Sequence, residues 1–329
     1  MTRSRLKLGF DNYSIRALNW KAPQLLDYAA SLRLDTVLFS DLDVYESLSD
    51  DYLRGIRSKA DDLGIEIQAG TGGIDRSSGF WNGKWGSPEQ LLRTTIRVAK
   101  ILGSRVARCY LGWIGDRKPN VGLRPHIDRV VKTCKSVRSV AIDSGVRIAV
   151  ENHAGDMHST ELLSLIEEAG RDYVGATLDT GNAVWALENP ADTLETLGRV
   201  AVSTGIRDSA VWATEDGAAF EWKAMGAGQV DWKAFFKRYA ELCPKTPVQL
   251  EIITGPSRDL AYYTPEYWGP WLDMPVSRFA RYVAFAKGGK KPAPYRTPKG
   301  LKAEQAWQKL QLEKSLHYCK QVLGLGLKR

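Results

Sequence analysis

The stretch RIAVENHAGDMH, residues 147–158, joins a short apolar run to a group of polar side chains. Residues 148–150 are typical of a buried strand, and they lead directly into Glu151 and, two residues later, His153. Burying a carboxylate is costly unless a charged or hydrogen-bonding partner compensates it. The group that compensates Glu151 therefore indicates what this protein does.

Apolar strand-like runs recur along the chain, and helical patterns lie between them. The strand-like runs are residues 5–10, 35–40, 65–69, 105–111, 147–151, 174–179, 200–206 and 248–253. The helical patterns are residues 23–32, 49–63, 88–102, 125–144, 159–169, 191–198, 231–242 and 276–287. Strict alternation predicts parallel strands joined by crossover helices, and eight such units are the stoichiometry of a TIM barrel. A doubly wound sheet is the rival, but no G-x-G-x-x-G follows the first run. We predict an α/β fold, a (β/α)8 TIM barrel over residues 1–287.

The end of the chain differs in composition. Residues 288–329 contain ten Lys or Arg and two Glu, so they carry the entire net charge of +8. We predict a basic Gly/Pro/Lys linker over 288–300 and then an amphipathic C-terminal helix. Its apolar stripe, Leu312, Leu316, Cys319 and Leu323, should pack on the barrel or on a second copy, which makes a homo-oligomer an open alternative. The neutral barrel argues against nucleic acid as a partner.

Composition also predicts a location. No run reaches the roughly 18 apolar residues of a membrane span, and no signal-peptide pattern is present. The four cysteines are scattered without a CxxC pair, as expected of reduced thiols. We therefore expect a cytoplasmic protein with no membrane partner.

Three carboxylates stand at the ends of strand-like runs, where helix capping explains them poorly: Glu151, Asp179 and Glu251. Active sites of TIM barrels lie at these strand ends. Converging carboxylates repel one another unless a cation lies among them, and oxygen ligands suit Mg²⁺ or Mn²⁺. The alternative is that they pair with Arg108, Arg207 or other basic side chains.

Four motifs in order, VENHAG, LDTGN, IRDS followed by GAGQVDW, and LEI, resemble the xylose isomerase-like barrel superfamily of sugar isomerases and epimerases. The resemblance implies a divalent ion held by Glu151, Asp179 and Glu251. It also implies a His ligand in a pattern like H-x-K-D, but this sequence reads GIRD and has Gly205 at that position. Three alternatives stay open: three carboxylates plus water hold the ion, His153 substitutes for the missing ligand, or the ion is lost.

The resemblance further implies a metal-dependent sugar isomerase or epimerase that moves a proton next to a carbonyl through an enediolate. Glu151 and Glu251 would be the acid/base pair, and Mn²⁺ or Mg²⁺ the cofactor. Predicted substrate-binding residues are His153, Arg108, Asn182, Arg207, Asp208, Trp113 and Trp185. Two alternatives stay open: a lyase or dehydratase acting on a keto-sugar or cyclitol, and a carbohydrate-binding barrel without catalysis. A related endonuclease activity would need more His ligands than this chain has.

Most tryptophans fall in segments predicted to be loops after strands. They are Trp20, Trp81, Trp85, Trp113, Trp185, Trp212, Trp222, Trp268 and Trp271. Flat rings with a polar edge suit the apolar face of a sugar, which favours a small-molecule carbohydrate as substrate. The alternative is that the long loops 209–230 and 254–275 need small cores of their own.

Overall fold

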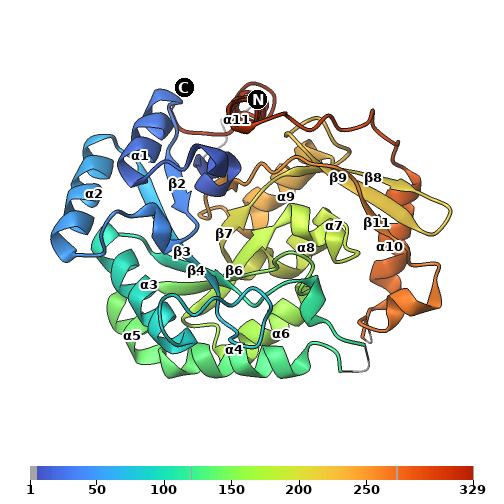
Figure 1. Ribbon diagram of the computed structural model, residues 1–329, viewed down its shortest axis with the longest axis horizontal. Coiled ribbons are helices and arrows are strands. Elements are labelled where there is room, and N and C mark those ends of the chain that lie inside the picture. Colours follow the sequence, from blue (N-terminus) through green and yellow to red (C-terminus); the bar gives the residue numbers. More distant parts are fainter. Residues whose placement is uncertain (1–5, 120, 272, 329) are drawn as a thin grey trace.

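The computed structural model describes residues 6–119, 121–271 and 273–328, and a barrel of parallel strands lies at its centre (Figure 1). The eight strands pair in the order β10-β1-β2-β3-β4-β5-β6-β7. Their bounds are β1 Leu8–Asp11, β2 Thr36–Phe39, β3 Glu66–Gly73, β4 Val106–Tyr110, β5 Arg147–Glu151, β6 Val174–Asp179, β7 Ala201–Gly205 and β10 Val248–Leu250. A parallel bridge between Ile206 and Leu250 brings the two edges together. The predicted TIM barrel is confirmed.

Helices surround the barrel, and all eight predicted helical segments are present. Their bounds are α1 Ala22–Ser31, α2 Asp50–Asp62, α3 Pro88–Leu102, α4 Arg124–Ser136, α5 Arg138–Ser144, α6 Ser159–Ala169, α7 Thr180–Trp185, α8 Pro190–Leu197, α9 Trp232–Leu242, α10 Val276–Lys287 and α11 Leu301–Gln321. Short 3-10 helices are η1 Asn12–Leu18, η2 Leu42–Val44, η3 Ile114–Asp116, η4 Gly198–Val200 and η5 Pro265–Trp268. The segment predicted as one helix over 125–144 is interrupted at Val137, whose φ of −115° is not helical.

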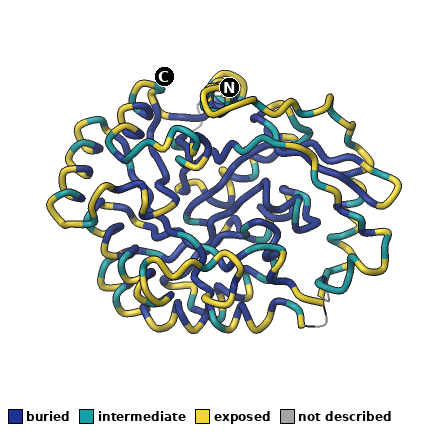
Figure 2. Tube along the Cα trace, in the orientation of Figure 1, coloured by how far each residue is buried: buried dark blue, intermediate teal, exposed yellow. Residues whose placement is uncertain are grey.

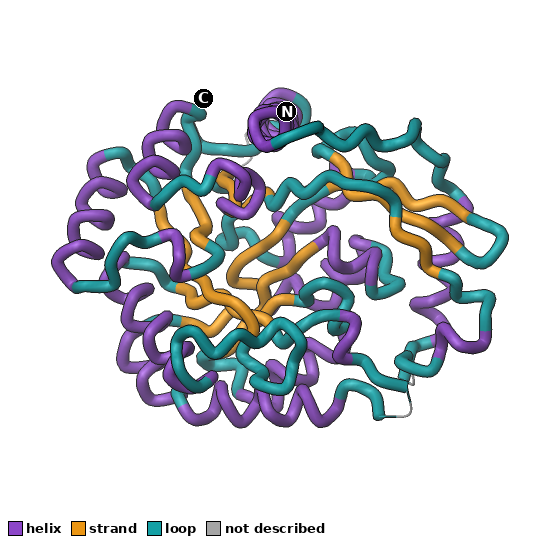
Figure 3. Tube along the Cα trace, in the orientation of Figure 1, coloured by secondary structure: helices purple, strands orange, loops and turns teal. Residues whose placement is uncertain are grey.

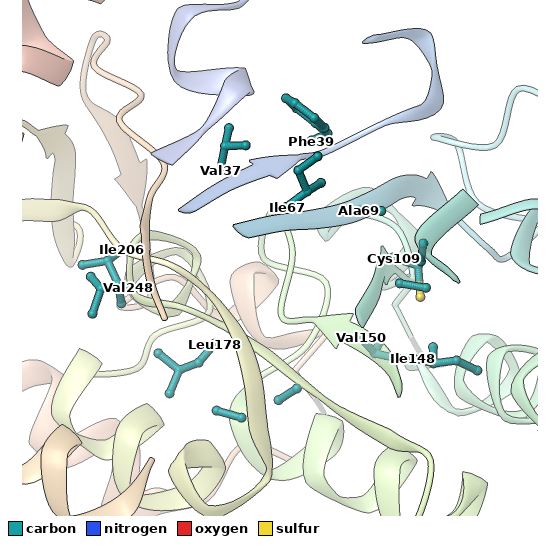
Figure 4. Packing of buried hydrophobic residues seen from close by; sticks show 14 of the residues in the cluster. Val37, Phe39, Ile67, Ala69, Cys109, Ile148, Val150, Leu178, Ile206 and Val248 are labelled. Atoms are coloured by element: carbon teal, nitrogen blue, oxygen red, sulfur yellow. The ribbon is translucent and has the colours of Figure 1, made fainter. Parts of the chain in front are cut away.

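Side chains alternate between the two faces of each strand. Outward-pointing apolar residues fill the space between strands and helices, as Figure 4 shows for Val37, Phe39, Ile148 and Val150. Figure 2 shows the same pattern for the whole chain, with buried strands inside and exposed helix faces outside. The residues between the outward ones therefore point into the barrel, and Glu151 is one of them.

The lower part of the barrel interior is polar but uncharged. Ser203 donates to Gln68 Oε1 at 2.8 Å, although their strands lie on opposite sides of the barrel. Gln249 Nε2 donates to Thr36 Oγ1 at 2.8 Å and to Gln68 Oε1 at 3.3 Å. This hydrogen-bonded layer closes the barrel below the strand ends without adding charge.

A second, antiparallel sheet stands beside the barrel, and the sequence patterns did not predict it (Figure 3). It consists of β8 Asp208–Ala213, β9 Ala218–Lys223 and β11 Arg258–Leu260. Helix α10 covers it, and a separate apolar core forms between them that includes Phe220, Leu260 and Tyr282. The eighth predicted helix therefore packs on this sheet and not on the barrel wall.

Helix α11 packs against the barrel. Leu312, Leu316 and Cys319 are at most 4% exposed, and they belong to the same core as the barrel strands. Beyond the helix, Gly326 N donates to Leu6 O at 3.1 Å. The apolar stripe is thus covered within the chain, so it gives no reason to expect a second copy there. Whether residues 1–287 fold without it stays a prediction.

Candidate active site

The three carboxylates predicted from the strand ends lie together at the carboxyl end of the barrel. Glu151 ends β5, Asp179 ends β6, and Glu251 directly follows β10. Each offers an oxygen within 4.8 Å of the others, and each side chain is buried. Successive side chains of a strand point to opposite faces, and all three carboxylates point into the barrel. Segments that are distant in sequence therefore meet here.

The guanidinium of Arg207 lies among these carboxylates. Arg207 Nη2 is 2.8 Å from Asp179 Oδ2, and Arg207 Nη1 is 2.6 Å from Glu251 Oε2. Gly181 makes room for it, because a Cβ there would lie 1.9 Å from Arg207 Nε. Gly205 makes room for its partner carboxylate, because a Cβ there would lie 2.6 Å from Asp179 Oδ2. The sequence left open that the carboxylates pair with basic side chains, and these contacts are ion pairs of that kind.

A second guanidinium holds the third carboxylate. Arg108 Nε donates to Glu151 Oε2 at 2.6 Å, and Asn182 Nδ2 donates to Glu151 Oε1 at 3.2 Å. Asn152 fixes the neighbouring strand end, since its Nδ2 donates to Asp179 O and its Oδ1 accepts from Asp179 N. Every carboxylate at the centre therefore has a cationic or amide partner.

The environment separates the acidities of the two glutamates. Burial raises the pKa of Glu151 to about 7, although Arg108 opposes the shift. For Glu251 burial is outweighed by Arg207, and its pKa lies below the usual value. Burial, aided by the charge of Glu251, raises the pKa of Asp11 to about 8. Two carboxyl groups with pKa values pushed apart can serve as an acid and a base.

The donor chemistry of the three carboxylates suits a hard divalent ion, but their arrangement does not fit one. The space among Asp179 and Glu251 is taken by the Arg207 guanidinium, and the fourth ligand position is Gly205. A guanidinium and a divalent ion in the same space would repel each other. With Arg207 in this position the centre is compensated by arginine, and the predicted Mn²⁺ or Mg²⁺ stays a prediction.

His153 lies beside this group and not within it. Its Nδ1 lies 2.6 Å from Gly112 O, and its ring stacks on Tyr110 with centroids 3.7 Å apart. Burial and the nearby Arg108 lower the pKa of His153 to about 3, which makes it neutral. A neutral ring that donates through Nδ1 keeps Nε2 as an acceptor. Among the described residues, the potential metal-ligating group contains Glu151, Asp179 and Glu251 and omits His153.

A cavity of about 460 Å³ opens above the centre. Predicted residues that line it are Arg108, His153, Asn182, Trp185, Arg207 and Glu251, joined by Trp81, Trp85, Trp222, Tyr110 and Arg258. Other tryptophans serve small cores, as Trp271 does under α10. The small-core explanation therefore applies to some tryptophans, and sugar binding stays a prediction for those that line the cavity.

Two predicted substrate-binding residues lie outside the lining of this cavity. Trp113 stacks behind Phe80, with ring centroids 5.3 Å apart, so Phe80 presents the aromatic face. Asp208 accepts from the backbone amides of Ser209, Gly226, Gly228 and Val230. These contacts hold the turn after β9 in place, and a role of Asp208 in substrate binding stays a prediction.

Two further residues at the site were not among the predicted ones. Asp11 was visible at the end of the first strand, where its position matched the other acids. No sequence pattern indicated that Arg258 belongs to the site, because β11 is short and its partner strand is distant in sequence. Only the antiparallel sheet brings Arg258 to the cavity.

The parallel barrel with acidic strand ends defines a class of fold, and comparison with known proteins identifies the family. A model of the family described as xylose isomerase-like TIM barrel matches residues 26–265, and the chain belongs to this family. The suspected superfamily is confirmed.

Individual relatives are distant. The chain is 24% identical to the uncharacterized protein YihM of Escherichia coli strain K12 over 258 residues, 75% of this chain and 72% of that one. It is 23% identical to 3-oxo-isoapionate decarboxylase of Pectobacterium atrosepticum over 212 residues, 64% and 70% of the two chains. A structure of D-psicose 3-epimerase in the presence of D-fructose superposes with a TM-score of 0.65 at 17% identity, covering 97% of this chain and 100% of that one. No helix in the described residues has the length and apolar character needed to cross a membrane.

Proposed function

We propose that this protein is an enzyme that transfers a proton at the carbon next to the carbonyl group of a sugar-sized substrate, as an isomerase or epimerase. The observation that carries the proposal is the pair Glu151 and Glu251 at one end of the barrel, with pKa values shifted in opposite directions. The fold shared with D-psicose 3-epimerase supports it. The cavity of about 460 Å³ suits a small molecule.

Glu251 is the proposed base. It lines the cavity, and Arg207 keeps it ionised at neutral pH. Glu151, whose pKa is raised to about 7, is the proposed partner, because about half of these side chains carry a proton at neutral pH. Because Glu151 lies behind Arg108, its proton would move only after that guanidinium turns toward the substrate. His153 and Asn182 would accept from or donate to substrate hydroxyl groups.

Removing a proton next to a carbonyl places negative charge on the carbonyl oxygen. A divalent ion would stabilise that charge as a Lewis acid, whereas here Arg207 and Arg108 supply positive charge to the cavity. We derive no step through a metal ion, because Arg207 takes the space among the carboxylates. The predicted ion would require Arg207 to withdraw first.

A second candidate is a lyase that works through an enolate of the same kind. The enolate is formed either by loss of carbon dioxide from a 3-oxo acid or by removal of a proton, and in the second case it then expels a β-hydroxyl group, which leaves as water after protonation. The relative named 3-oxo-isoapionate decarboxylase favours it, since a 3-oxo acid releases its carboxylate when the charge on the carbonyl oxygen is stabilised. Glu151 would then protonate the enolate. In both cases the arginines act on the oxygen and a glutamate acts on the carbon.

The experiment is solvent deuterium exchange. Six-carbon ketoses and keto acids are incubated with the protein in D2O at neutral pH, and proton NMR follows the C–H next to the carbonyl. We expect protein-dependent loss of that signal, or release of carbon dioxide, for at least one compound. A compound that binds without exchange, epimerisation or elimination would favour the carbohydrate-binding alternative.

A further inference from the structure

Arg258 occupies an unusual electrostatic position in the cavity. It is half-buried on β11, and its guanidinium lies 4.4 Å from the Trp222 ring centroid and 4.9 Å from that of Trp185. The aromatic rings hold the guanidinium from one side, where they provide no hydrogen-bond acceptor of the strength of a carboxylate.

The two other guanidiniums on the cavity floor have acidic partners. Arg108 pairs with Glu151, and Arg207 pairs with Asp179 and Glu251. Within residues 6–119, 121–271 and 273–328, Arg258 forms no ion pair and its side chain donates no hydrogen bond. Arg16 also lines the cavity and forms no ion pair among the described residues, but it is exposed and its guanidinium donates to Tyr13 O at 3.3 Å. Arg258 is therefore the half-buried guanidinium of this cavity that has no hydrogen-bond acceptor among the described residues.

The surroundings of Arg258 disfavour its positive charge. Burial, together with the charge of Arg207, lowers its pKa. Arg207 itself lies 4.3 Å from the Trp222 ring centroid, so two cations share one aromatic side chain. A half-buried guanidinium that is repelled by its neighbour gains most from an anion with two oxygens, which matches its planar fork of donors.

We infer that Arg258 is an anion-binding subsite, and that the substrate is an acidic derivative of a sugar whose carboxylate or phosphate contacts it. The inference rests on the proposed function, because it places the substrate in the same cavity. It also orients the substrate: Asp41 and Asp43 line another part of the wall, and they disfavour an anion there. The anionic group lies toward the antiparallel sheet, and the reacting carbonyl lies toward Glu251.

Binding of a matched pair of compounds tests the subsite. 2-Keto-D-gluconate and D-fructose have the same six-carbon chain with a ketone at the second carbon, and they differ in a carboxylate against a hydroxymethyl group. Calorimetry on the full chain should give at least about tenfold tighter binding of the acid. D-Fructose 6-phosphate is the third arm, and tighter binding of the phosphate than of the acid assigns the anion as phosphate.

Variants separate charge recognition from a change in shape. Arg258→Met should weaken binding of the preferred anion by about 10- to 100-fold and leave D-fructose binding unchanged, while Arg258→Lys should restore part of the loss. Arg76→Met is the control, because Arg76 is exposed and lines a different hollow. The inference is overturned if neither anion binds more tightly than D-fructose, or if Arg258→Met weakens all three ligands equally.

The two proposals fail in different ways. The subsite is measured as equilibrium binding and needs no turnover, whereas the proposed function is measured as exchange of a carbon-bound proton. Anion-selective binding without exchange would remove the proposed reaction and keep the subsite. Exchange on D-fructose without selectivity for either anion would do the opposite.

Discussion

The strand ends of the barrel and the antiparallel sheet face one cavity, but their arginine side chains differ in whether they have carboxylate partners. At the strand ends each guanidinium is matched by buried carboxylates, as Arg207 is by Asp179 and Glu251. On the sheet, Arg258 rests on aromatic rings without an acidic partner among the described residues. A paired charge is part of the structure, while an unpaired one is available to a ligand. This difference agrees with the two proposals, which place the chemistry at the barrel and recognition of the ligand at the sheet.

The two helices after β10 differ in the same way, because α10 packs on the antiparallel sheet and α11 packs on the barrel. Removing α11 should have the largest effect on stability. Ending the chain after Gly289 keeps α10 on the sheet and uncovers the barrel where Leu312, Leu316 and Cys319 pack. Buried apolar side chains contribute about 1.5–3 kcal/mol each, so the loss should be roughly 5 kcal/mol or more. Thermal unfolding should show a large fall in Tm or no folded barrel.

A pair of point variants on α11 serves as the control for that truncation. Leu316→Ala should cost about 2–5 kcal/mol, whereas Leu310→Ala, at a residue 42% exposed, should cost far less. Equal costs, or a truncated chain as stable as the full one, would show that α11 does not belong to the barrel core and would support the boundary at 287.

Glu251→Gln tests the chemical side of the comparison. It removes the proposed base and one partner of Arg207, and turnover should fall by about 10²- to 10⁴-fold. The measurement is the rate of deuterium exchange on whichever compound the wild-type protein turns over. Glu215→Gln, at an exposed position of the β8–β9 hairpin, should leave the rate unchanged. Full activity of Glu251→Gln would remove Glu251 from the mechanism.

Stability distinguishes the two arginines directly. Arg207→Met leaves buried carboxylates without their cation, and we expect a loss of about 3–5 kcal/mol in the free energy of unfolding. Arg258→Met removes a charge that has no carboxylate partner and should cost under about 1 kcal/mol. Urea denaturation of both variants gives the comparison, and similar losses would contradict the distinction between the barrel and the sheet.

Replacing the guanidinium should make room for a metal ion. Gly205→His introduces a nitrogen ligand, but its Cβ meets Asp179 while Arg207 still fills the space. The double variant Gly205→His/Arg207→Ala should bind Mn²⁺ at least about tenfold more tightly than the wild-type protein, measured by electron paramagnetic resonance. Arg207→Ala alone is the control. Stoichiometric, tight Mn²⁺ binding by the wild-type chain would instead support the metal-dependent enzyme predicted from the sequence.

The last prediction concerns how stability depends on pH. The pKa of Asp11 is raised to about 8, so the folded state keeps a proton that the unfolded chain releases near pH 4. Its contribution to stability is complete below about pH 4 and is lost as pH rises toward 8, with a slope of at most about 1.4 kcal/mol per pH unit. Asp11→Asn should flatten the decline between pH 6.5 and 8 in urea denaturation. An unchanged slope would show that Asp11 does not hold this proton.

The sequence by itself determined the barrel and its three central acids. Strand and helix periods are local properties, and alternation of the two predicts a parallel sheet without knowledge of distant contacts. Glu151, Asp179 and Glu251 could be identified because each stands at the end of an apolar run. The position of the missing histidine, Gly205, followed from the order of motifs.

Only the tertiary structure decided which cation lies among those acids and which one remains for a ligand. Arg207 reaches the centre because Gly181 on α7 leaves space for it and Gly205 on β7 leaves space for its partner Asp179, a condition that involves separate elements. Arg258 reaches the cavity because β11 pairs with β9, about 38 residues earlier in the chain. Contacts of this kind depend on packing between distant segments, and no local period in the sequence records them.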